Sequence, residues 1–215
     1  IIVILAVVAS GLVSWNIYLQ QSKKVESASL EKMAFPLPDK PSIAVLPFDN
    51  LSKDQSDAYI ADGLSENIIS SLSTIPELLV IAKNSTFVYK GKAVKVNQVA
   101  EELGVRYVLE GSVQKFEDKI RVIAQLIDAV SGHHLWSERY DREIKDFFQI
   151  LDEITIKIAD ALRVKMVRGG DVSTMGSTSS FEAWSNYVKG LRHFDRYTKQ
   201  DNIRARGLLK KAIEL

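Results

Sequence analysis

The chain contains no cysteine and only three histidines among its 215 residues. Without cysteine it has no disulfide bonds and no thiolate ligands for a metal ion. Two of the histidines, His133 and His134, are adjacent and follow a Ser-Gly turn. Neighbouring side chains on a strand point to opposite faces, so this pair is poorly placed to hold one ion together. We therefore predict no metal site.

The sequence also lacks the motifs on which common catalytic and nucleotide-binding sites depend. It contains neither GxxxxGK[ST] nor GxGxxG, and neither GxSxG nor HExxH. Its 28 basic and 27 acidic side chains give a net charge of +1. That near-neutral balance does not provide the basic surface with which proteins displace counterions from nucleic acid. We predict no catalytic residue, no cofactor and no nucleic-acid partner for this segment.

Charged side chains are absent from residues 1–22. At 1.5 Å per residue the apolar stretch 1–19 covers about 28 Å, close to the hydrocarbon thickness of a bilayer. Trp15 and Tyr18 stand near its end, where aromatic rings favour the membrane interface. We predict a transmembrane helix over residues 1–21, with the membrane as a partner. The alternative is a signal peptide, although residues 18–21 make a poor cleavage site.

Small residues recur every four positions in this stretch, at Ala6, Ser10 and Ser14. That spacing places them on one helix face, where a second helix could approach closely and form a homodimer. The alternative is that small residues are simply common in such helices. Lys23 and Lys24 follow the stretch, and by the positive-inside rule they favour a cytoplasmic C-terminal side.

The rest of the chain divides by composition. Residues 22–40 are polar and proline-containing, which predicts a linker, and residues 167–180 are rich in Gly, Ser and Thr, which predicts a second one. Between them, residues 41–166 predict an α/β domain whose mixed sheet is packed with helices. The expected strands are 42–48, a nearly continuous apolar run, and 78–82, 105–114, 120–128 and 134–140. The expected helices are 59–75, with an apolar stripe at four-residue spacing, 97–103 and 147–166. For the second of these helices, Asn97 is the expected N-cap and Gly104 the residue that ends it. Two further helices are expected within residues 181–215.

Five separated blocks between about residues 40 and 165 resemble one known domain. They are KPSIAVLPFDN (40–50), YIADGL (59–64), AKNS (82–85) with YKGK (89–92), LGVRYVLEGSV (103–113), and QLID (125–128) with Gly132, Leu135 and Trp136. In this order they look like the TolB-like domain, which is related to the amino-terminal part of TolB and to FlgO. The resemblance implies an α/β fold that binds protein or envelope ligands.

Residues 181–215 resemble the first helical hairpin of a tetratricopeptide array. The resemblance rests on Gly190 in the first helix and on Ala205, Leu209 and Ala212 in the second. The spacing between Gly190 and Ala212 is about three residues shorter than the repeat pattern, or shifted in register. Because one repeat cannot bury its own apolar face, the resemblance implies further repeats after Leu215.

A membrane helix, a TolB-like domain and such an array together resemble the C-terminal half of bacterial signalling proteins. In these the upstream part is a class III adenylate or guanylate cyclase, or a winged-helix transcription regulator. The resemblance implies a cytoplasmic output domain and a periplasmic TolB-like region, in conflict with Lys23 and Lys24, and we give it more weight. We thus expect a non-catalytic, membrane-anchored sensing or interaction segment, most simply of a cyclase. The alternative is the same segment of a winged-helix regulator.

Four polar residues within the family blocks are candidates for contact with a protein partner: Asp62, Asn84, Glu110 and Asp128. The alternative for each is a cap or a turn, because Asp and Asn side chains readily bond to nearby backbone groups. A basic run between residues 188 and 211 is either a second partner-binding face or an ordinary solvated helix surface.

Overall fold

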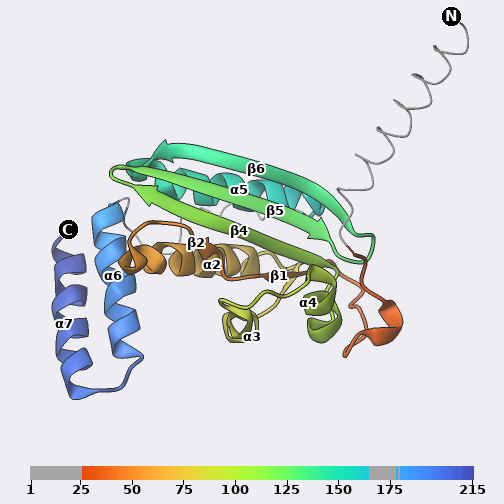
Figure 1. Ribbon diagram of the computed structural model, residues 1–215, viewed down its shortest axis with the longest axis horizontal. Coiled ribbons are helices and arrows are strands. Elements are labelled where there is room, and N and C mark those ends of the chain that lie inside the picture. Colours follow the sequence, from red (N-terminus) through yellow and green to blue (C-terminus); the bar gives the residue numbers. More distant parts are fainter. Residues whose placement is uncertain (1–25, 165–177, 179) are drawn as a thin grey trace, which may run out of the picture.

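The computed structural model describes residues 26–164, 178 and 180–215. Its six-stranded sheet has the order β3-β1-β4-β5-β6, with β2 pairing beside β1 on β4 (Figure 1). Strand β1 runs parallel to β3 and β4, whereas β4, β5 and β6 form an antiparallel meander. The strands are β1 Ser42–Val45, β2 Asp49–Asn50, β3 Leu79–Val80, β4 Tyr107–Phe116, β5 Lys119–Asp128 and β6 His133–Glu143.

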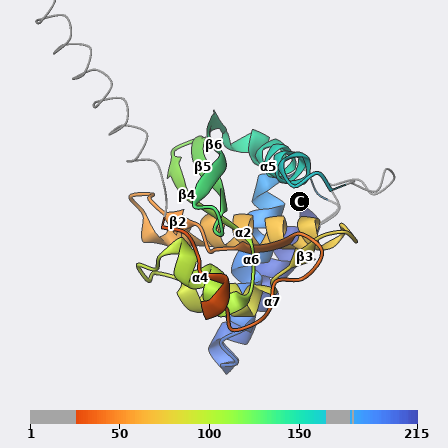
Figure 2. The same ribbon diagram turned by 90° about the vertical axis from the view of Figure 1, so that its right-hand side faces the viewer.

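Helices cover the sheet unequally. Helices α2 and α5 lie together on one face, and the short α4 lies on the other, near the amino-terminal end of β4 (Figure 2). Helices α6 and α7 form a hairpin that packs beside α2. The helices are α2 Ala58–Ser73, α3 Lys83–Thr86, α4 Val96–Leu103, α5 Phe147–Ala161, α6 Phe181–Phe194 and α7 Lys199–Glu214.

The stripe of α2 supplies much of the larger core. Ile60, Leu64, Ile68 and Leu72 recur at four-residue spacing, and all four are fully buried. Helix α5 adds a similar stripe that includes Ile154. Each such side chain contributes about 1.5–3 kcal/mol of hydrophobic free energy on burial. Both helices are confirmed, although α5 ends at Ala161 rather than at residue 166. Their apolar periodicity matches the face that meets the sheet.

Strand β1 is buried on both faces, which explains its continuous apolar sequence. Ile43 and Val45 point into the core under α2, whereas Ala44 points into the smaller core under α4. A central parallel strand between two layers of helix has no solvent side on which a polar residue would be favoured.

The structure differs from the expectations at the start of α4 and at the short helix α3. Asn97 was predicted as the N-cap of α4, which is wrong: Lys95 occupies that position and Asn97 lies within the first turn. The predicted glycine at the other end is confirmed, since Gly104 adopts a left-handed conformation with φ of 64°. The four-residue helix α3 was not predicted at all, because it is too short for an apolar period to appear.

The predicted fold class needs a correction. It joined a transmembrane helix to the α/β domain and a tetratricopeptide array, but no helix within the described ranges is long and apolar enough to cross a membrane. The described residues form a mixed α/β fold with a six-stranded sheet and six helices. The apolar stripes of α2 and α5 face the sheet. Residues 1–21, with Ala6, Ser10 and Ser14, lie outside the described residues.

The C-terminal hairpin packs through small residues. A Cβ atom on Gly190 of α6 would come within 2.8 Å of the Leu209 side chain of α7. On its other side α6 meets α2, where a Cβ on Gly63 would come within 2.5 Å of the Trp184 ring. Trp184 is held in turn by Phe147 and Phe181, whose ring centroids lie 4.6 and 5.5 Å away. The structure shows no tetratricopeptide array in the described part of the chain, where α6 and α7 form a single helical hairpin.

This packing predicts a cost for enlarging Gly63. In an exposed helix, replacing Gly by Ala stabilises by up to about 1 kcal/mol. At Gly63 the added methyl group meets the Trp184 ring, which neighbouring rings hold in place, so Gly63→Ala should lower the free energy of unfolding by about 1–3 kcal/mol. Gly207 of α7 has open space around it and is the matched control. Urea denaturation should show Gly207→Ala unchanged or stabilised, and equal stabilisation of both variants would contradict the packing.

Candidate interaction site

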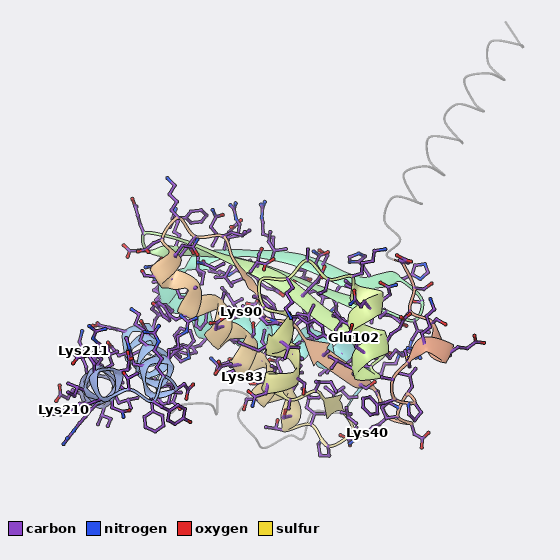
Figure 3. All side chains as sticks on the ribbon, turned by 60° about the horizontal axis from the view of Figure 1, so that its bottom comes forward. Lys40, Lys83, Lys90, Glu102, Lys210 and Lys211 are labelled. Atoms are coloured by element: carbon purple, nitrogen blue, oxygen red, sulfur yellow. The ribbon has the colours of Figure 1, made fainter. Side chains whose placement is uncertain are left out.

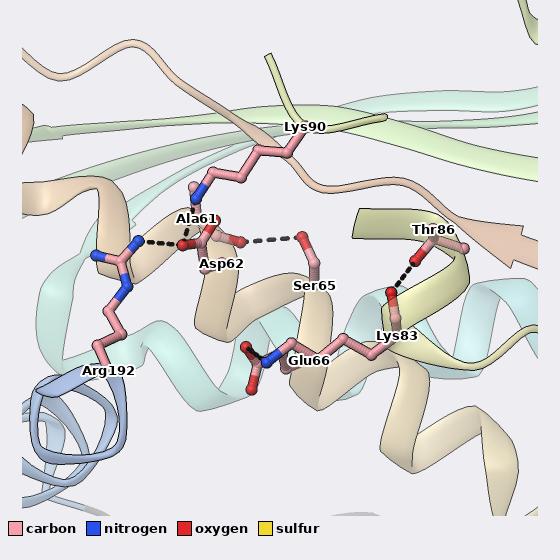
Figure 4. Close-up of polar contacts among 8 residues, drawn as sticks. All are labelled: Ala61, Asp62, Ser65, Glu66, Lys83, Thr86, Lys90 and Arg192. Carbon is pink, nitrogen blue, oxygen red and sulfur yellow. Dashed lines mark hydrogen bonds and ion pairs between the residues drawn. The ribbon is translucent and has the colours of Figure 1, made fainter. Parts of the chain in front are cut away.

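Asp62 lies on α2 and is only 6 % exposed. Its Oδ2 atom accepts a hydrogen bond from the Lys90 Nζ atom at 2.6 Å and a second one from the Arg192 guanidinium. Its Oδ1 atom is buried without a hydrogen-bond partner. Figure 4 shows the two cations reaching this carboxylate from opposite sides. We call Asp62, Lys90 and Arg192 the Asp62 clamp.

The clamp joins three segments that are far apart in the sequence. Lys90 follows a 3₁₀ turn that ends at Tyr89, and Arg192 lies in the last turn of α6, 130 residues after Asp62. The side chains of Lys90 and Arg192 are 45 % and 38 % exposed, so both cations keep part of their hydration. The buried carboxylate, in contrast, depends on them for compensation of its charge. The clamp therefore fastens α6 and the segment after α3 to the same point on α2.

Helix α6 makes further polar contacts with Tyr59, which lies one turn before Asp62 on α2. The Ser185 hydroxyl donates a hydrogen bond to the Tyr59 hydroxyl at 2.9 Å, and both residues are buried. The Lys189 ammonium lies 4.3 Å from the centre of the Tyr59 ring, within the range of a cation–π interaction. Hydrogen bonds and charge thus fix the orientation of α6, in addition to the apolar contact through Trp184.

Asp128 is also buried, and its hydrogen-bonding capacity is used within the chain. It is 5 % exposed at the end of β5. Its Oδ2 atom accepts from the Arg106 Nε and Nη2 atoms at 3.1 and 2.9 Å. Its Oδ1 atom accepts from the backbone N–H groups of Val130 and Ser131 at 3.1 and 3.2 Å. This geometry fixes the turn between β5 and β6.

The other two candidates are more open. Asn84 is exposed on α3. Glu110 is partly buried on β4, where burial and, to a smaller extent, the charge of Asp49 raise the pKa of its carboxyl group. The segment of residues 89–94 links two of the candidates: it supplies Lys90 to Asp62 and also borders a pocket that contains Glu110. Asp128 lies elsewhere, at the β5–β6 turn.

Sequence reasoning did not find Lys90 or Arg192 as partners of Asp62. Lys90 stands in a family block, which was the one available signal. Arg192 belongs to the basic run of residues 188–211, where nothing in the spacing separates it from its exposed neighbours. Figure 3 shows two of those neighbours, Lys210 and Lys211, on the helical hairpin. Within the described residues no group of three or more acidic or histidine side chains is placed to hold a metal ion.

A family model described as "HilA/YgeH-like transcriptional regulator, second domain" matches residues 39–160, more than half of the chain. The chain belongs to this family. The HilA/YgeH-like domain begins just before β1 and extends almost to the end of α5.

One similar protein, from Rhizobium meliloti (strain 1021), is named as a candidate adenylate cyclase. It is 46 % identical over 181 residues, which are 83 % of this chain and 31 % of that protein. The chain therefore spans about a third of the length of this relative.

Solved structures show partial similarity. TolB from Acinetobacter baumannii is 21 % identical, with a TM-score of 0.45 over 60 % of this chain and 30 % of that chain. The C-terminal domain of LpoB from Escherichia coli is 15 % identical, with a TM-score of 0.38 over 53 % of this chain and 92 % of that chain. The expected resemblance is confirmed in part: the family shown is the HilA/YgeH-like one, and the relative that is 46 % identical is named as a candidate adenylate cyclase.

The Asp62 clamp predicts a specific loss of stability. Asp62→Asn keeps the size of the side chain but removes the charge that both cations compensate. Hydrogen bonds to charged groups contribute about 1.5–3 kcal/mol, so the free energy of unfolding should fall by about that amount. Glu66→Gln is the matched control: Glu66 lies on the same helix as Asp62, but its ion pair with Lys83 of α3 is more exposed, so its loss should change stability by less than about 1 kcal/mol. Equal effects of the two changes in urea denaturation would show that the clamp does not stabilise the fold.

Proposed function

We propose that this chain is a non-catalytic interaction and relay module within a longer bacterial signalling protein. The observation that carries the proposal is the Asp62 clamp, which ties the helical hairpin to the α/β domain through a buried carboxylate. The proposal requires two states of this contact, with the carboxylate either paired or hydrated, and a balance between them that responds to a force on α6. The absence of catalytic motifs from the sequence supports a role in binding rather than chemistry.

The parent protein, in this proposal, is an adenylate cyclase. The support is the relative named as a candidate adenylate cyclase, which is 46 % identical over 181 residues. Because the chain spans 31 % of that relative, a catalytic domain has ample room elsewhere in a parent of similar length. The module would bind a protein partner and pass the effect of binding to the output domain by moving the hairpin against the sheet.

A second candidate parent is a transcription regulator. It is favoured by the family description, which names HilA/YgeH-like transcriptional regulators. The two parents differ in the part that is absent from this chain, since a cyclase needs metal-binding carboxylates and a winged-helix regulator needs a basic recognition helix. The same module could serve either, because a fold does not determine the output to which it is attached.

The decisive experiment measures output in the full-length parent. Cyclic AMP production should change at least threefold in Asp62→Asn, because the clamp that positions α6 is lost, and should stay at the parental level in Glu66→Gln. The purified 215-residue chain alone should not convert ATP. Parental output in both variants would exclude the relay, and specific DNA binding without cyclase activity would favour the transcription regulator.

We further propose that the module acts in the periplasm. The support is the resemblance of its sequence blocks to TolB-like domains, which outweighs the two lysines at positions 23 and 24. In the full-length parent, a reporter enzyme that is active only in the periplasm should be active when fused after Gly170. If only a cytoplasmic reporter is active at that position, an intracellular scaffold becomes the better account.

A further inference from the structure

The face of the sheet opposite α2 and α5 carries a polar pocket of about 400 Å³. Along β4, Leu109 and Val113 point into the core under α2 and α5, so the alternating Glu110 and Ser112 point to the opposite face. Gln125 on β5 pairs directly with Glu110 in the sheet register and joins them in the pocket. These three side chains form its floor.

The pocket exists because the covering layer is short. Helix α4 packs over Val108 and Ile127, and none of its residues lines the pocket that contains Glu110. Two segments form the walls: residues 46–51, which follow β1 and include β2, and residues 89–94, which precede α4. The second wall is anchored, since Lys90 within it is bonded to Asp62. The pocket is therefore bounded by the sheet and by segments that have fixed attachments.

Glu110 on the pocket floor forms no ion pair within the described residues. Burial and the negative charge of Asp49, which lines the same pocket, both raise the pKa of Glu110. Lys92 also lines the pocket, and its positive charge helps to lower the pKa of Glu102. Glu110 and Asp49 thus repel each other, and in the described part of the chain no cation offsets this effect on Glu110. A cationic group from outside would relieve that repulsion.

We propose that this pocket binds the cationic side chain, an arginine guanidinium or a lysine ammonium, of a protein partner. Glu110 and Asp49 supply negative charge, and the Gln125 amide and the Ser112 hydroxyl supply further hydrogen-bond acceptors for N–H groups. The volume is at the low end of the range of about 300–1,000 Å³ for small-molecule pockets, which suits one inserted side chain. That the cationic group belongs to a protein rests on the proposed function. A free polyamine would offer the same positively charged N–H groups.

The test follows the carboxyl ¹³C signals of glutamate in the labelled 215-residue chain by NMR at pH 7. The probes are acetyl-arginine amide and Nα-acetyl-lysine amide, with acetyl-citrulline amide as the uncharged match to arginine and spermidine as the polyamine. The Glu110 signal should shift saturably with at least one of the two cationic amides. Glu110→Gln should weaken that binding at least tenfold, measured through the amide signals of residues 89–94, and Glu66→Gln should leave it unchanged.

Urea denaturation shows whether a loss of binding in Glu110→Gln comes from unfolding. A carboxyl group with a raised pKa binds its proton more tightly in the folded chain than in the unfolded chain. As the pH rises above 4.5, the ordinary pKa of glutamate, Glu110 therefore lowers the free energy of unfolding. At pH 7 the neutral glutamine variant should therefore unfold at the same or a higher urea concentration than the parent.

Three outcomes would overturn the proposal: no response of Glu110 to any cation at millimolar concentration, equal binding of acetyl-citrulline amide, or tighter binding of spermidine than of both amides. The last would assign the pocket to a polyamine. These readouts are independent of cyclic AMP production by the parent, so the relay and the pocket fail separately.

Discussion

Helix α2 is packed on two sides, and the rest of the structure depends on that double contact. One side of the helix buries Ile60, Leu64 and Ile68 against the sheet. The neighbouring side has Gly63, whose missing Cβ lets the Trp184 ring approach, and Asp62, whose carboxylate holds Arg192. The apolar contacts provide most of the free energy, because burial of large side chains outweighs a single ion pair. The ion pair and the tight steric fit decide how α6 is oriented.

The two sites share a structural element. Residues 89–94 pass from the Asp62 clamp to the wall of the Glu110 pocket, with Lys90 in one and its neighbours Tyr89 and Gly91 in the other. A group that enters the pocket and moves this segment therefore changes the surroundings of Asp62, and release of Arg192 changes the support of the wall. Under our proposals the coupling is reciprocal, as linkage requires of two binding equilibria on one molecule.

Buried charge has different consequences at the three acidic residues considered. Asp128 is fully engaged by Arg106 and by two backbone N–H groups, so its role is to fix a turn. Asp62 is paired through one oxygen, with the other left buried and unpartnered. Glu110 forms no ion pair in the described part of the chain, and burial raises its pKa. Burial alone does not separate a structural carboxylate from one that is available to a partner. The difference lies in how many of its hydrogen bonds and ion pairs are already made within the chain.

The sequence by itself determined the order of the elements and the faces that they bury. The four-residue stripe of α2, the apolar run of β1 and the glycine that ends α4 each follow from local periodicity or backbone preference, and each was predicted correctly. The predicted roles of Asp62, Glu110 and Asp128 could not be separated in the same way, because all three are acidic residues in polar positions of family blocks. Only the tertiary structure decided that Arg192, 130 residues away, meets Asp62, that Asp128 is enclosed by its own turn, and that no residue of α4 lines the pocket that contains Glu110. Periodicity reports which face of one element is apolar, whereas charge pairing and pocket shape depend on which elements are brought together in space.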